Sequence, residues 1–78
     1  MIQLTDAQWD LLLAVAKANE MHYEPPRIKG AKHGTCKALA RMGLLESDGR
    51  RCTEKGWFFV RDEISDGRRT AQFAKGNG

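Results

Sequence analysis

Three side chains spaced four residues apart have the chemistry to bind phosphate groups. His33, Lys37 and Arg41 follow one another at this interval, and residues four apart in a helix lie on the same face. Cys36 and Leu39 fall on the opposite face of the same segment. Lysine and arginine contact phosphates and base edges, and histidine can change its charge near neutral pH. The segment therefore predicts a helix that is apolar on one side and basic on the other.

The lysines and arginines are concentrated in the middle of the chain. Residues 27–61 contain nine of them against three acidic residues, a balance of +6, whereas residues 1–26 contain one against four, a balance of −3. A basic part next to an acidic part favours a surface directed at phosphates. The alternative is a solvated basic face that keeps a small domain in solution. Spacing alone leaves both interpretations open.

No combination of residues in the sequence indicates catalysis. It contains no nucleophile with a base at a recognised spacing, no glycine-rich phosphate loop after a strand and no cluster with metal-ligand spacing. We therefore expect no enzyme, no catalytic residue, no metal site and no cofactor. Cys36 and Cys52 are interpreted as small buried hydrophobic residues. A disulfide between them is the alternative, which a reducing compartment disfavours.

The sequence also lacks the pattern of a membrane or export segment. No run of about 18 apolar residues is present, and no basic region precedes an apolar one. We therefore expect a cytoplasmic protein that makes no membrane contact.

The 78 residues are enough for one domain, and the first half of the chain predicts two helices. Thr5 and Gln8 have the spacing of a capping box, which starts a helix that should run to about Glu20. Residues 25–28 begin with two prolines, which cannot continue a helix, and are expected to form a short extended edge strand. The second helix should begin between residues 31 and 35 and end at residue 42, before a left-handed glycine cap.

The second half predicts a hairpin and a third helix. Asp48-Gly49 lies between two short extended runs, which favours a β-hairpin with a type I′ turn. Thr53 is placed to cap the third helix, and Gly56 within it should let another element approach closely. The expected apolar face of this helix consists of Trp57, Phe58, Val60 and Ile64.

The order of these elements and their motifs resemble the winged-helix DNA-binding domains. Residues 35–46 are similar to the recognition helix of such regulators, which ends in a basic residue, a glycine and two aliphatic residues. Residues 48–56 resemble the wing and the start of the next helix, and residues 4–9 resemble the first helix of MarR-type regulators. The resemblance implies an α+β fold over residues 1–65, with the order helix, short strand, helix, β-hairpin wing, helix. Residues 66–78 would form a flexible, basic and glycine-rich tail.

Two features depart from the family's pattern. The positioning helix that normally precedes the recognition helix is absent or reduced to a single turn around residues 29–32, since residues 21–34 contain two prolines and two glycines. The wing, with its Asp48-Gly49 turn, is as short as a hairpin can be. Both departures reduce the surface that is usually offered to a duplex.

The resemblance implies a small regulator or accessory factor of transcription that binds double-stranded DNA. In this family the recognition helix enters the major groove and the wing contacts the backbone or the minor groove. Because side chains alternate along a strand, only one of the two wing arginines is expected to point outward, and Arg50, nearer the turn, is favoured over Arg51. The candidate nucleic-acid-binding residues are Lys29, Lys32, His33, Thr35, Lys37, Arg41, Arg50 and Arg51. Arg68, Arg69 and Lys75 of the tail are candidates for further phosphate contacts.

Two other kinds of partner remain open at this stage. An exposed aromatic residue on the third helix would suit a homodimer interface. The alternative function is a protein-interaction module of a phage or mobile element, which would use the same scaffold to block or bridge a host protein or nucleoprotein complex.

Overall fold

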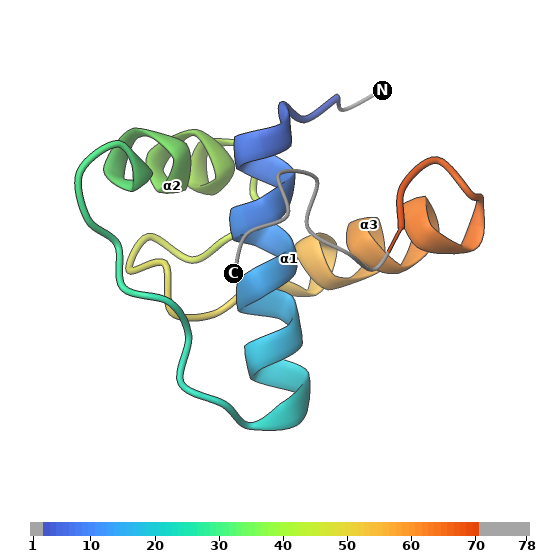
Figure 1. Cartoon of the computed structure of the whole chain (residues 1–78), viewed down its shortest axis with the longest axis horizontal. Helices are drawn as coiled ribbons and strands as arrows, with labels where there is room; N and C mark the ends of the chain where they lie inside the picture. The colour runs from blue at the N-terminus through green and yellow to red at the C-terminus, as the bar shows by residue number, and fades with distance from the viewer. Residues whose placement is uncertain (1–2, 71–78) are drawn as a thin grey trace.

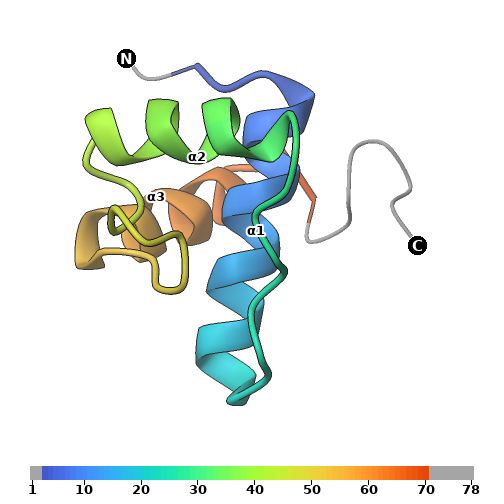
Figure 2. The same ribbon diagram turned by 90° about the vertical axis from the view of Figure 1, so that its left-hand side faces the viewer.

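The structure is a computed structural model that describes residues 3–70. Along this part the chain forms three α-helices, α1 (Asp6–Met21), α2 (Lys32–Arg41) and α3 (Glu54–Ser65) (Figure 1). α1 packs against both of the others. α2 crosses beside the N-terminal half of α1, and the chain between them returns along the side of α1 (Figure 2). α1 is therefore the central element of the domain.

Local sequence signals determine where α1 begins and ends. The Gln8 backbone N–H donates to the Thr5 hydroxyl at 3.1 Å, and the Thr5 backbone N–H donates to the Gln8 side chain at 3.0 Å, which confirms the capping box. His22 then ends the helix with a left-handed φ of 61°. Three consecutive leucines, residues 11–13, are all buried. Successive residues point in different directions on a helix, so α1 must be covered on more than one side.

α2 occupies the predicted place in the chain. A single turn precedes it, in which the backbone N–H groups of Lys32 and His33 donate to the carbonyls of Lys29 and Gly30. Gly43 follows its end with a φ of 79°, as expected for a left-handed cap. This turn lies at residues 29–32, where the sequence predicted at most a single turn.

The predicted α+β winged-helix fold is wrong, because the described residues form no sheet. Their strand-like pairing is limited to an isolated antiparallel bridge between Leu45 and Cys52, and no strand forms at residues 25–28. The molecule is a small all-helical fold. The segment expected to be a wing is a loop, closed by the N–H of Glu46 donating to the carbonyl of Arg51 at 2.9 Å.

The hairpin stops after one bridge for a reason visible in its backbone. The Glu46 carbonyl, which the next rung of a ladder would use, instead accepts the N–H of Gly49 at 3.0 Å. Gly49 has a positive φ of 69° but Asp48 does not, so the type I′ turn, which needs both, is not formed. The Asp48 carboxylate accepts the Arg50 N–H at 2.9 Å instead.

A side chain of α1 holds the second arm of this loop. The Asn19 amide group donates to the Arg50 carbonyl at 3.1 Å, and its oxygen accepts the Cys52 N–H at 2.8 Å. Asn19 therefore satisfies two backbone groups that a neighbouring strand would otherwise pair. The loop is fastened to the helix rather than to a sheet.

Asn19→Ala is expected to destabilise the domain by about 1–3 kcal/mol, because two hydrogen bonds are lost and the partly buried Cys52 N–H is left without a partner. Urea denaturation followed by circular dichroism measures the change. Glu20→Ala is the matched control, because Glu20 is the exposed neighbour on the same helix and should change stability by less than about 0.5 kcal/mol. Equal stability of the two variants would show that the amide bonds do not hold the loop.

α3 begins at a cap that also ties it to the end of α2. The Thr53 hydroxyl accepts the Gly56 N–H at 3.0 Å and donates to the Gly43 carbonyl at 2.5 Å. A Cβ on Gly56 would lie 2.0 Å from the Leu44 carbonyl oxygen. The close approach expected at this glycine is confirmed, and the approaching element is the chain that leaves α2.

The predicted apolar face of α3 is partly wrong. Val60 is buried and Ile64 packs against the core, but Phe59 packs there as well, whereas Phe58 is 46% exposed. The core draws on all three helices and their connections. Its buried residues are Leu4, Trp9, Leu11, Leu12, Leu13, Val15, Ala16, Cys36, Leu39, Leu44, Leu45 and Val60.

Both cysteines are free thiols, with Cys36 buried and Cys52 half-buried. Burial raises the pKa of each thiol, and the negative charge of Asp48 raises the pKa of Cys36 further. The interpretation as a small buried hydrophobic residue is confirmed for Cys36, whereas Cys52 is only partly buried and packs against the core. Among the described residues, no helix combines the length and the apolar character needed to cross a membrane.

Candidate nucleic-acid interface

The outer face of α2 carries the three residues whose spacing suggested phosphate binding. His33, Lys37 and Arg41 are all exposed, while Cys36 and Leu39 on the opposite side are buried against the core. This division follows from helix geometry, because residues at intervals of four share a face. α2 lies at the periphery of the domain (Figure 2), and its exposed face is a basic ridge of His33, Lys37 and Arg41.

The cations on and before α2 have no partner within the described structure. Residues 25–45 contain five lysines and arginines and no acidic residue. Within residues 3–70, the side chains of these five form neither a hydrogen bond nor an ion pair. All five are exposed, namely Arg27, Lys29, Lys32, Lys37 and Arg41. We call these residues, together with His33, the α2 basic surface.

Three cations elsewhere in the described chain make structural contacts within it. Lys55 donates to the Met42 carbonyl at 3.2 Å, at the C-terminal end of α2. The Arg61 guanidinium lies over the Trp57 ring, 5.4 Å from its centre. Arg68 forms an ion pair with Glu63 and another with Asp66. The contrast indicates that the α2 basic surface is not needed for the fold.

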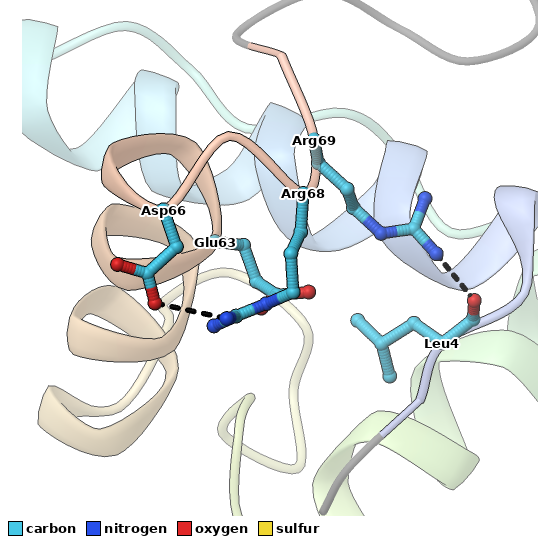
Figure 3. A network of polar contacts seen from close by, with 5 residues as sticks. All are labelled: Leu4, Glu63, Asp66, Arg68 and Arg69. Atoms are coloured by element: carbon cyan, nitrogen blue, oxygen red, sulfur yellow. Dashed lines mark hydrogen bonds and ion pairs between the residues drawn. The ribbon is translucent and has the colours of Figure 1, made fainter.

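Arg69 joins the two ends of the described part of the chain (Figure 3). Its guanidinium donates to the Leu4 carbonyl at 2.6 Å and lies over the buried Trp9 ring, 5.1 Å from the ring centre. The Asp6 carboxylate is 3.9 Å away. The first residues of the expected tail thus contact the body of the domain, and Arg68 and Arg69 are already engaged. Residues 71–78, including Lys75, lie outside the described part of the chain.

Arg69→Ala is expected to lower the free energy of unfolding by about 1.5–3 kcal/mol, because it removes a charged hydrogen bond and a cation–π contact over a buried ring. Arg68→Ala is the matched control: its ion pairs are more exposed, and their loss should change stability little. Thermal denaturation of the two variants measures the difference. If Arg68→Ala proves the more damaging change, the contact with Leu4 and Trp9 does not hold the ends together.

Thr35 does not belong to the outer face of α2. Its side chain is half-buried, and its hydroxyl donates to the Ala31 carbonyl at 3.4 Å. It lines a small hollow between α1 and the start of α2. Thr35 therefore lines a hollow against α1, together with Lys32, and does not share the outer ridge of His33, Lys37 and Arg41.

Arg50 and Arg51 lie apart from the α2 basic surface. Both line an open depression formed by the end of α1, the residues after it, the loop and the start of α3, and no residue of α2 lines it. The expectation that only one of them points outward is wrong, since both are exposed. Alternation requires a strand, and these residues lie in a loop. The structure therefore divides the predicted site into two surfaces.

No family model, curated protein or solved structure matches the chain at a significant level.

Two residues of these surfaces were not predicted from the sequence. Arg27 is a free cation of the α2 basic surface, and the absence of acidic residues from 25 to 45 is the signal that would have found it. Asn19 positions Arg50 by bonding its carbonyl. No local pattern marks Asn19, because its partners lie more than thirty residues away.

Proposed function

We propose that the protein binds double-stranded DNA through the α2 basic surface, as a regulator or accessory factor of transcription. The observation that carries the proposal is the group of five exposed cations without partners on a stretch that has no acidic residue. Phosphate neutralisation by lysine and arginine supplies most of the affinity for DNA that does not depend on sequence. The proposal includes a cytoplasmic location, where thiols such as Cys36 and Cys52 stay reduced.

The dimensions of α2 suit the major groove of a duplex. Its ten residues span about 15 Å, and the groove is about 12 Å wide and admits an α-helix. With the ridge of His33, Lys37 and Arg41 directed into the groove, the cations on the preceding segment are placed to meet the phosphates beside it.

The first turn of α2 gives independent support, because it lacks the side-chain cap and the acidic residue with which the other two helices begin. α1 and α3 each begin with a threonine cap and an acidic residue in the first turn, whereas α2 has no side-chain cap and begins with Lys32. Cations at this end of a helix oppose its dipole. A phosphate bound at this end would be stabilised both by the helix dipole and by Lys29 and Lys32. An uncapped, basic helix start is therefore suited to binding a phosphate group.

The test is the fluorescence anisotropy of a labelled duplex of about 25 base pairs and random sequence, at about 50 mM and about 200 mM salt. Micromolar binding should be seen at the lower salt. If five phosphates are neutralised, affinity should fall roughly 10²- to 10³-fold at the higher salt. Absence of binding at both salt concentrations would refute the proposal.

One observation favours a second candidate function. Arg50 and Arg51 lie outside the α2 basic surface, so a duplex would meet a single helix and the segment before it. A surface of this small size also suits docking on an acidic patch of another protein, as an interaction module would use it. In that case the chain should bind no duplex and should retain a specific acidic partner that Lys37→Glu releases.

A further inference from the structure

The depression that contains Arg50 and Arg51 is a second surface with its own chemistry. It has a volume of about 910 Å³ and opens to solvent between the C-terminal end of α1, the loop and the start of α3. Its lining includes the large aromatic side chains of Tyr23, Trp57 and Phe58 and the imidazole of His22. No residue of the α2 basic surface takes part, so the depression can be occupied while that surface stays free.

Exposed hydrophobic side chains are concentrated in and beside this depression. The large hydrophobic residues exposed within residues 3–70 are Met21 (57%), Tyr23 (65%) and Phe58 (46%). Tyr23 and Phe58 line the depression, and Met21 ends the helix beside it. The Phe58 ring meets the Trp57 ring edge-on at 5.3 Å. Clustered aromatic exposure of this kind is typical of a protein interface, where tyrosine, tryptophan and arginine are enriched.

The same depression carries charges of both signs that do not pair with each other. Arg50 and Arg51 line it together with the carboxylates of Glu20, Asp48 and Glu54. Among the described residues, no ion pair joins either arginine to any of these three. The Asp48 carboxylate accepts only a backbone N–H here, that of Arg50. Three carboxylates against two arginines make the depression a poor site for a polyanion such as nucleic acid.

We infer that the depression is the dimer interface of the protein and that its occupant is a second copy of this chain. In a two-fold interface the same surface patch of each copy contacts the other. Every contact between one residue of the first copy and another residue of the second copy therefore occurs twice. A surface with unpaired charges of both signs satisfies this condition, since the arginines of one copy can meet the glutamates of the other, twice. Tyr23, the most exposed aromatic residue of the set, enters the depression of the other copy.

The size of the surface sets the expected affinity. The depression is lined by 14 residues, fewer than the roughly 20–30 on each side of a standard interface. We therefore expect a weak dimer, with a dissociation constant in the micromolar range. This inference does not rest on the proposed DNA binding, because the two surfaces share no residue. If both hold, the dimer displays two α2 basic surfaces.

The test uses charge reversal in two complementary variants and sedimentation velocity from about 1 to 300 µM, a range chosen for micromolar affinity. Arg50→Glu/Arg51→Glu makes the charges of the depression negative, and Glu20→Lys/Glu54→Lys makes them predominantly positive. Each variant alone should sediment as a monomer because like charges then face each other. An equal mixture of the two should form a dimer again, a rescue that only pairing between copies explains.

Tyr23→Ser tests the apolar part without altering charge, and should weaken the dimer at least tenfold. Circular dichroism of each variant establishes that it is folded. The inference is overturned if the wild-type chain is monomeric up to the highest concentration, which would leave the depression to a different protein. It is also overturned if the reversed variants dimerise like the wild type or if their mixture stays monomeric. No DNA is present, so these outcomes are independent of the anisotropy result.

Discussion

A variant with Lys37→Glu and Arg41→Glu is expected to lose DNA binding and to remain folded. Both side chains lie on the exposed ridge of α2 and have no partner within residues 3–70. Reversing them puts two carboxylates where phosphates must approach, and affinity at low salt should fall roughly 100-fold or more. The free energy of unfolding should change by no more than about 1 kcal/mol, most of it from glutamate at the C-terminal end of the helix. Anisotropy and thermal denaturation measure the two effects.

Neutral substitutions separate a local contact from an effect of net charge. Lys37→Gln/Arg41→Gln should reduce the slope of log affinity against log salt by about 2, one unit for each phosphate that is no longer neutralised. Arg61→Glu changes the net charge by the same amount, but it lies on α3 beside Trp57, and the slope should not change. If Arg61→Glu lowers the slope equally, DNA responds to the overall charge and α2 is not the contact surface. Binding that survives the double reversal would show that α2 is not the contact surface.

Gly56→Ala is expected to have the largest effect on stability of any single substitution proposed for this domain. The added Cβ would lie 2.0 Å from the carbonyl oxygen of Leu44 and 2.9 Å from its carbonyl carbon. These are backbone atoms of a buried residue next to the Gly43 cap, so they cannot turn aside as a flexible side chain can. α3 would have to move away from the chain that follows α2. The expected loss is about 3 kcal/mol or more, a large part of the roughly 4–12 kcal/mol typical of a domain of this size.

Gly34→Ala is the matched control, since Gly34 is also a glycine within a helix. A Cβ at Gly34 would meet no atom within 4 Å, and alanine in a helix is favoured over glycine by about 0.5–1 kcal/mol. Gly34→Ala should therefore stabilise the domain. Chemical denaturation of the two variants compares them directly. If both substitutions stabilise the protein, the close approach of α3 to residue 44 does not constrain the fold.

The helices could be predicted from the sequence because their signals are local. The Thr5–Gln8 capping box, the Thr53 cap and the left-handed Gly43 each act within a few residues. The start of α1, the end of α2 and the start of α3 follow from such signals to within about two residues. The exposed ridge of α2 was equally predictable, because helical periodicity alone sorts the residues of a segment onto opposite faces.

The wing was predicted wrongly because local sequence signals do not determine the structure of this loop. Asp48-Gly49 between two extended runs favours a hairpin, but a ladder also needs the Glu46 carbonyl, which the turn itself takes. Asn19 of α1 then supplies the hydrogen bonds that a strand would have supplied to Arg50 and Cys52. A side chain thirty residues away thus decides the structure of the loop, and no pattern within the loop records it.

By itself, the sequence determined where the helices lie and which side of α2 is basic, since both depend on neighbours along the chain. Tertiary structure decided which cations are free. Arg69 bonds the Leu4 carbonyl and covers Trp9, while the equally basic Arg50 lines a depression to which no residue of α2 contributes. Charge and spacing do not distinguish such residues. Only the packing of distant segments determines whether an arginine finds a partner within its own chain or remains free for another molecule.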